Sequence, residues 1–151
     1  MTTFADSSAL VKLYADEAGH EEVRALNAVA VAQLARVEVP SALWRKQRTG
    51  ELSPSDTQLL TAEFEADYFG TEDERPRFAV AAATSEILDE AARLCARHGL
   101  RAYDAVQLAT AIAVRTADPS CTDIAVFDTD LRNAAATEGF RTIPTEKANT
   151  A

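Results

Sequence analysis

The stretch TFADSSALVKLYADE, residues 3–17, places a carboxylate at the junction of two elements of secondary structure. A very short apolar segment leads to Asp6, and Leu10, Leu13 and Tyr14 then recur at helical spacing. The stretch therefore predicts a buried strand, an acid at its end, and a helix. Two interpretations of the acid remain open: Asp6 is a helix N-cap, or it belongs to a site where a strand ends.

The alternation of strand and helix continues along the rest of the chain. After a short helix at HEEVRALN, further strands are expected over residues 28–34, 78–84, 123–128 and 140–144. Longer helices are expected over residues 35–50, 52–70, 85–99, 102–117 and 129–139. This pattern predicts the α/β class, with a central, mainly parallel sheet covered by helices on both faces.

Length, composition and charge narrow the class of protein. The 151 residues fit a single domain, spanning 1–151, with one sizeable core. A hydrophobic content of 47% and a charged content of 26% are typical of globular proteins. The net charge of −9 argues against broad adhesion to nucleic acid, although a local basic rim around a site is compatible with it.

Cysteine usage and hydropathy favour a cytoplasmic protein without a membrane segment. Cys95 and Cys121 lie far apart and frame neither a zinc site nor a disulfide scaffold. The N-terminus lacks the pattern of a signal peptide, and no stretch approaches the roughly 18 apolar residues of a membrane span. The polar tail from about residue 145 is expected to be loose.

Three aspartates share one setting in the predicted fold. Asp6 follows the first strand, Asp104 opens the helix AVQLATA, and Asp128 follows IAVF and precedes another helix. The carboxyl ends of parallel strands lie on one edge of a sheet, and ligands bind there. We expect Asp6 and Asp128 on that edge, and Asp104 beside them if its helix starts on the same side. Glu38, in the helix after the second strand, is the fourth candidate.

Each of these acids also has a purely structural interpretation. Asp is favoured at N-caps, where it contributes about 1 kcal/mol. Asp104 with Gln107 resembles a capping box, and Glu38 alone fits a solvated helix position. A functional site depends on convergence, because gathered carboxylates repel, which raises pKa values or recruits a cation. Oxygen ligands without His or Cys suit Mg²⁺ or Mn²⁺.

Four segments carry a resemblance to a known family. In chain order, DSSALVKLYADE, ARVEVPSALWR, LRAYDAVQLATA and VFDTDLRNAA resemble the signature segments of the PIN-domain family, most closely its VapC-type toxins. The resemblance runs from Asp6 to about Ile143. It implies a three-layer α/β/α fold and a metal-dependent ribonuclease that pairs with an antitoxin and forms a homodimer.

The resemblance also implies roles for individual residues. Four positions match the acidic site of the family: Asp6, Glu38, Asp104 and Asp128. All except Glu38 are expected to face the metal ion; Glu38 is either a further ligand or orients the water, and Asp130 competes with Asp128. Ser8 matches the hydroxyl position and is expected to orient a carboxylate or a metal-bound water. The chain departs from the family at Gln107, where relatives often have His, and at Pro40, close after the second acid.

This set of acids predicts hydrolysis of RNA phosphodiester bonds by a metal-activated water, without a covalent intermediate. Two alternatives stay open. An aspartyl-phosphate phosphatase-like domain also places an Asp after its first strand, but its usual Asp-x-Asp motif would need an acid where Ser8 stands. A catalytically silent PIN-like module would only bind RNA or an antitoxin.

Two further groups of side chains bear on partners. Cations that could contact the RNA backbone are Arg45, Lys46, Arg48, Arg101 and Arg115. Six apolar or aromatic side chains exceed what two small helices need for one core, and they predict either a partner surface or ordinary burial: Trp44, Leu59, Leu60, Phe64, Tyr68 and Phe69.

Overall fold

A computed structural model describes residues 1–145, and its centre is an all-parallel sheet of five strands in the order β3-β2-β1-β4-β5. The strands are β1 (Thr2–Ala5), β2 (Ala28–Ala32), β3 (Phe78–Ala81), β4 (Asp123–Ala125) and β5 (Arg141–Ile143). Because every neighbouring pair is parallel, the carboxyl ends of all five strands lie on the same edge.

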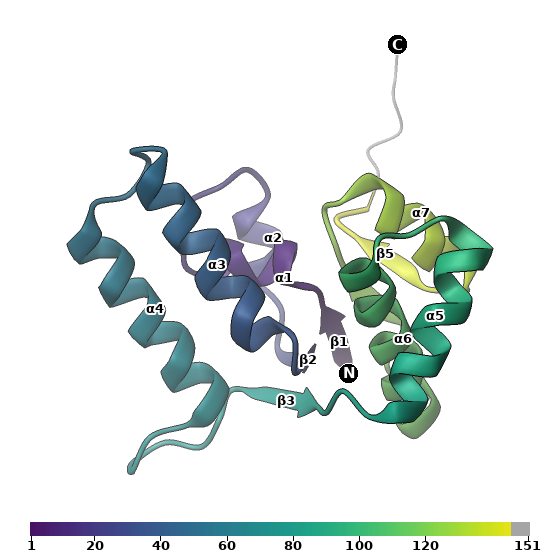
Figure 1. The fold of residues 1–151 in the computed structure, drawn as a ribbon. Helices are drawn as coiled ribbons and strands as arrows, with labels where there is room; N and C mark the ends of the chain where they lie inside the picture. The colour runs from purple at the N-terminus through teal and green to yellow at the C-terminus, as the bar shows by residue number, and fades with distance from the viewer. Residues whose placement is uncertain (146–151) are drawn as a thin grey trace.

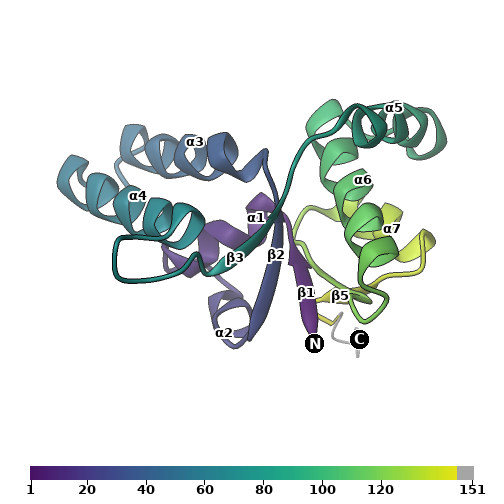
Figure 2. The same cartoon turned by 90° about the horizontal axis from the view of Figure 1, so that it is seen from below.

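Helices cover both faces of this sheet, as Figures 1 and 2 show. One face carries α1 (Ser7–Leu10), the 3₁₀ helix η1 (Val11–Leu13), α2 (His20–Arg24), α3 (Ala35–Arg48) and α4 (Pro54–Phe69). The other face carries α5 (Ser85–His98), α6 (Ala102–Ala117) and α7 (Thr129–Thr137). The predicted three-layer α/β/α class is confirmed.

Two hydrophobic cores follow from the alternation of side chains along the strands, whose successive residues point to opposite faces. In β2, Ala30 and Ala32 belong to the core beneath α5, α6 and α7, whereas Val29 and Val31 belong to the core beneath α1 to α4. Phe4 of β1 joins the first core. The apolar run of β2 is therefore needed on both faces, as expected of a buried parallel strand.

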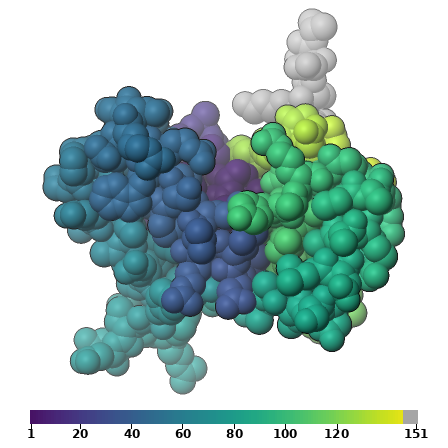
Figure 3. Space-filling view, viewed as in Figure 1, coloured from purple at the N-terminus to yellow at the C-terminus, as the bar shows by residue number. Residues whose placement is uncertain are grey.

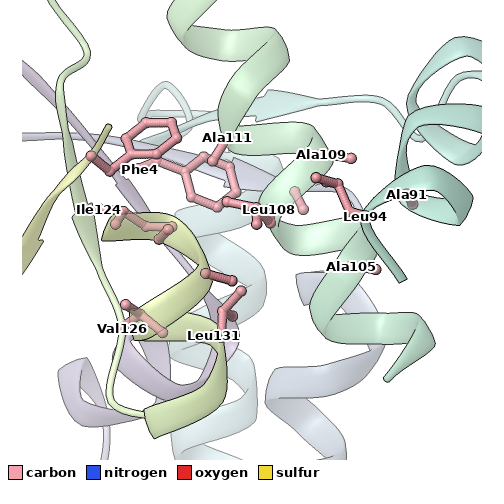
Figure 4. Packing of buried hydrophobic residues seen from close by; sticks show 14 of the residues in the cluster. Phe4, Ala91, Leu94, Ala105, Leu108, Ala109, Ala111, Ile124, Val126 and Leu131 are labelled. Atoms are coloured by element: carbon pink, nitrogen blue, oxygen red, sulfur yellow. The ribbon is translucent and has the colours of Figure 1, made fainter. Parts of the chain in front are cut away.

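The core beneath α6 fixes that helix against the central strand. Figure 4 shows Phe4 of β1 beside Leu108 and Ala111 of α6, and all three side chains are fully buried. Ala105, at the start of the same helix, is also fully buried. This packing holds the first turn of α6 in a defined position relative to the end of β1.

Several predicted strands end earlier than the sequence indicated. β2 ends at Ala32, β3 at Ala81 and β4 at Ala125. After β4, the N–H of Val126 still donates to the carbonyl of Ile143 in β5 (2.9 Å), and the N–H of Phe127 donates to Ser8 Oγ (3.1 Å) and not to a strand. Pro40 lies inside α3 and does not end it.

Three other predictions concern the ends and the surface. That residues 1–151 form one domain stays a prediction, and the predicted loose tail falls on residues 146–151, outside the described residues. Within the described chain, no helix combines the length and the apolar character that crossing a membrane requires. Of the proposed partner surface, Phe64 and Tyr68 are buried, whereas Leu59 and Phe69 are 60% and 52% exposed.

Candidate active site

Asp6 lies where the order of the strands reverses. The chain passes from β1 to β2 and β3 on one side, and it then returns to β4 on the other side of β1. In open parallel sheets a crevice forms at such a point, at the carboxyl ends of the strands. Asp6 directly follows β1, and its N–H donates to the carbonyl of Ala125 at the end of β4 (3.1 Å). Figure 3 shows the purple N-terminal segment recessed between blue α3 and green α6.

The side chain of Asp6 is buried and caps α1. It is 4% exposed, and its Oδ1 accepts hydrogen bonds from the Ala9 N–H (3.1 Å) and the Ser8 hydroxyl (2.6 Å). The N-cap interpretation is therefore confirmed. It leaves the functional interpretation open, because both bonds use Oδ1 and no described residue donates a hydrogen bond to Oδ2.

The environment of Asp6 disfavours its ionised form. Burial is the main reason that its pKa rises to about 7; hydrogen bonds from Ser8 and Ala9 oppose the rise, and the charges of Glu38 and Asp104 add to it. No described Lys, Arg or His forms an ion pair with this carboxylate. A buried acid among other acids, without a countercharge, favours the binding of a proton or of a cation.

Asp104 faces the same group of acids. Burial raises its pKa, as do the charges of Asp128, Glu38 and Asp130, whereas Arg101 lowers it. The capping-box interpretation of Asp104 is wrong, because α6 begins two residues earlier and Arg101 occupies the N-cap position. Its carboxylate is therefore not used as a helix cap, and its charge raises the pKa of Asp6, so the two lie on the same edge.

Glu38 is held by two donors from other helices. Its Oε1 accepts hydrogen bonds from the Ser7 hydroxyl (2.9 Å) and from Gln107 Nε2 (2.7 Å). Gln107 Nε2 also donates to Ser7 Oγ (3.0 Å), and both donor residues are buried. This network joins α1, α3 and α6. Sequence reasoning missed it, although a lone Gln in the apolar stretch of α6, one turn after Asp104, was a signal.

Ser8 links Asp6 to the loop that carries Asp128. Its hydroxyl donates to Asp6 Oδ1 and accepts from the N–H of Phe127. The next residue, Asp128, caps α7 and accepts a hydrogen bond from the Leu131 N–H through Oδ2 (3.0 Å). The N-cap interpretation of Asp128 is thus also confirmed, and Asp130 lies in the first turn of the same helix.

Two cavities meet beside these acids. One, of about 300 Å³, is lined by Glu38, Arg101, Ala102, Tyr103 and Asp104. The other, of about 270 Å³, includes Ser7, Ser8, Val37, Glu38, Ser41, Arg45 and Tyr103. Arg101 and Arg45 are therefore the described cations that line these two cavities. Lys46 is instead bound by Glu17 (2.6 Å), and Arg115 lies in the last turn of α6, remote from Asp104.

The candidate acids lie in a segment that matches a known protein family. The model of the PIN domain matches residues 3–136, a range that includes all of the candidate acids. This chain belongs to the PIN-domain family. The resemblance of the four segments to PIN domains is thereby confirmed.

Curated and solved relatives of this PIN domain agree with the assignment. Ribonuclease VapC45 and ribonuclease VapC49, from two strains of Mycobacterium tuberculosis, are each 33% identical to it over 145 residues, with 93% of this chain and 94% of each relative covered. The crystal structure of M. tuberculosis VapC20, a sarcin-ricin loop cleaving toxin, superposes with a TM-score of 0.61 at 18% identity, covering 92% of this chain and 96% of that one. This likeness supports the fold.

The acids of this PIN domain fit a weakly held, hard divalent cation. Within residues 1–145, no three His, Cys, Asp or Glu side chains are grouped closely enough to hold an ion together. Mg²⁺ does not require such a cage, because it keeps several waters and uses one or two protein carboxylates. The oxygen-only donor set and the uncompensated burial of Asp6 match that chemistry.

Proposed function

We propose that this PIN domain is a metal-dependent endoribonuclease that hydrolyses phosphodiester bonds of RNA, and that it is the toxin of a toxin–antitoxin pair. One observation carries the proposal: Asp6 is buried at the switch point of the sheet, close to Glu38 and Asp104, and no cation within residues 1–145 pairs with it. The relatives named as ribonucleases support the reaction class.

The metal ligands in this proposal are Asp6, Asp104 and Asp128, with Glu38 and Asp130 as further candidates. The ion is Mg²⁺ or Mn²⁺. When bound, it makes a water easier to deprotonate and stabilises negative charge on the phosphate oxygens. No covalent enzyme intermediate is needed.

The other polar residues orient the reacting groups. Ser8 fixes Asp6 through Oδ1, which leaves Oδ2 for the ion. Ser7 and Gln107 hold Glu38 through Oε1, which leaves Oε2 to orient or accept a proton from the attacking water. Arg45 and Arg101, one in each cavity, offset the charge of the RNA phosphates despite the acidic net charge.

A protein partner and a cytoplasmic location complete the proposal. The exposed Leu59 and Phe69 lie on α4, and a cavity of about 680 Å³ lined by Tyr14, Leu52 and Leu60, among others, adjoins the same helix. Charged side chains complete the lining of this cavity: Asp16, Glu17, Lys46, Glu51 and Asp56. A surface that mixes apolar and charged groups suits an amphipathic segment of an antitoxin. Homodimerisation is an expectation from the family.

The substitution Asp6→Asn tests the proposed reaction. Asn caps a helix about as well as Asp, so the fold should persist, whereas the negative charge that a hard cation needs is removed. We expect cleavage of an RNA substrate to fall by about 10³-fold or more, since metal stabilisation of the transition state amounts to several kcal/mol. EDTA should abolish cleavage by the unchanged protein, and Mg²⁺ or Mn²⁺ should restore it.

A matched control is Asp123→Asn, which changes another buried aspartate at the opposite edge of the sheet. Its folded fraction should cleave as fast as the unchanged protein. Full activity of Asp6→Asn, or cleavage undiminished by EDTA, would refute the mechanism. RNA binding without cleavage at saturating metal would favour a silent binding module, and a trapped acyl phosphate on Asp6 would favour the phosphatase alternative.

A further inference from the structure

Tyr103 is an exposed aromatic side chain in the middle of the candidate site. It precedes Asp104 in the first turn of α6, and 64% of its surface is exposed. Among the described residues it has no aromatic or cationic stacking partner, and its hydroxyl forms no hydrogen bond with a side chain. Neither core packing nor a polar contact of the fold explains a tyrosine at this position.

Tyr103 and Glu38 share two cavities of the candidate site. Both side chains line the cavity of about 300 Å³ and the cavity of about 270 Å³. Each cavity also contains one arginine, Arg101 in the first and Arg45 in the second. Tyr103 therefore stands at the boundary between two cavities, one lined by Arg101, Glu38 and Asp104 and the other by Arg45 and Glu38.

We propose that Tyr103 is a stacking platform for one base of single-stranded RNA, beside the phosphate that is cleaved. The inference rests on the proposed function and adds a specific nucleotide contact to it. A strand that passes Glu38 would place consecutive phosphates near Arg101 and Arg45, and the base between them would lie on the tyrosine ring. Bases of single strands stack on aromatic side chains in this way, with little dependence on the base.

The experiment separates base stacking from backbone binding. The full chain carries Asp6→Asn, so that it binds RNA without cutting it, and binding is measured with Mg²⁺ by fluorescence polarisation. The two probes are fluorescein-labelled oligoadenylate and an abasic ribose-phosphate oligomer of the same length. Tyr103→Ala is compared with Tyr103→Phe, which keeps the ring. The control Leu88→Ala removes an exposed side chain on α5 that lines neither cavity.

Tyr103→Ala should weaken binding of oligoadenylate by about 5- to 100-fold, the range found for one stacked base. It should leave binding of the abasic oligomer unchanged, and Tyr103→Phe and Leu88→Ala should bind both probes like the parent. An equal loss on both probes, or no loss on oligoadenylate, would overturn the inference. If Tyr103→Ala weakened only the binding of the antitoxin, the side chain would be a protein contact and the inference would be wrong.

Failure of the inference is distinguishable from failure of the proposed function. Binding is measured in a variant that does not depend on catalysis, whereas the proposed function is judged by metal-dependent cleavage with Asp6 intact. In the cleaving protein, Tyr103→Ala should raise KM for RNA with a much smaller change in kcat, because stacking holds substrate and transition state alike. A fall in kcat at constant KM would contradict a platform role.

Discussion

Asp6 and Asp123 are two buried aspartates at opposite edges of the same sheet. They are 4% and 2% exposed, and they lie after the end of β1 and at the start of β4. Asp123 has its own cation: Arg141 on the neighbouring strand donates Nε to Oδ1 (3.1 Å) and Nη2 to Oδ2. Asp6 has no such partner in the part of the chain that the structure describes, and the charges of Glu38 and Asp104 raise its pKa.

The difference separates a structural acid from a candidate site. Burying a carboxylate costs free energy unless a countercharge or hydrogen bonds compensate it. The fold compensates Asp123 with an arginine, whereas at Asp6 it adds two further negative charges. Burial alone does not indicate function, but burial without compensation, at the edge where ligands bind, makes Asp6 a candidate functional residue.

The contrast between Asp6 and Asp123 predicts its largest effect on the free energy of unfolding, when a substitution removes the charge of Asp6. The raised pKa means that the contribution of Asp6 to stability is fully present below pH 3.8 and is lost as the pH rises through about 7. In EDTA at pH 8, Asp6→Asn should therefore be more stable than the unchanged protein. The difference should be up to roughly 4 kcal/mol, since each unit by which the pKa is raised corresponds to about 1.4 kcal/mol. At pH 4 the two should be nearly equal.

Urea unfolding at both pH values measures this difference. The control is Asp123→Asn, which removes a compensated charge and should lower stability at pH 8. Equal stability of Asp6→Asn and the unchanged protein at pH 8 would mean that Asp6 carries no electrostatic strain, and the contrast between the two aspartates would disappear.

The next effect is stabilisation by an added cation. An ion that binds only the folded state stabilises it by about 2.7 kcal/mol at 100 times its dissociation constant. We expect Mg²⁺ or Mn²⁺ to raise the Tm of the unchanged protein and of Asp123→Asn alike, and to raise that of Asp6→Asn much less. Thermal unfolding with each ion and with EDTA is the measurement. Equal shifts in all three proteins would place the ion elsewhere.

A smaller effect is expected when Asp123 loses its partner. Arg141→Met leaves a buried carboxylate without its ion pair, so the Tm should fall, while cleavage by the folded protein stays unchanged. The double variant with Asp123→Asn should regain most of the loss. Arg93→Met is the control, since Arg93 is exposed and pairs with the partly exposed Glu90 on its own helix. A Tm drop no larger than that of the control would show that the pairing is unimportant.

The sequence predicted the parts of this architecture that follow from local rules. Strand and helix alternation led to a parallel sheet, and the preference of Asp for N-caps held at Asp6 and Asp128. The rule that ligands bind at the carboxyl ends of parallel strands selected Asp6 and Asp128 as candidates, since each follows a predicted strand. Whether the candidate acids bind one metal ion stays a prediction.

Contacts between distant segments could not be predicted from such local rules. Ser7 and Glu38 are 31 positions apart, and Gln107 and Glu38 are 69 apart, so their hydrogen bonds depend on which strands and helices become neighbours. The predicted bounds of α6, residues 102–117, are confirmed, but the capping-box interpretation of Asp104 was wrong, because Arg101 stands at the N-cap. Tyr103 drew no attention in the sequence, since exposure is a property of the folded chain.

The smallest effect expected here concerns Gln107, a positioning residue that acts through Glu38. Gln107→Leu removes the Nε2 donor to Glu38 while Ser7 still donates, so one of two charge-assisted bonds is lost. Such a bond contributes roughly 1.5 kcal/mol, so kcat for RNA cleavage should fall by about 10-fold with a smaller change in KM. Gln107→His, which can still donate from a ring nitrogen, should recover most of the rate. Thr110→Val is the control, because Thr110 is buried in the same helix but bonds only to the carbonyl of Val106. An equal loss of kcat in Thr110→Val would mean that Gln107 contributes to the reaction only through packing of the helix. A loss confined to Gln107→Leu would indicate that the orientation of Glu38 matters to the reaction.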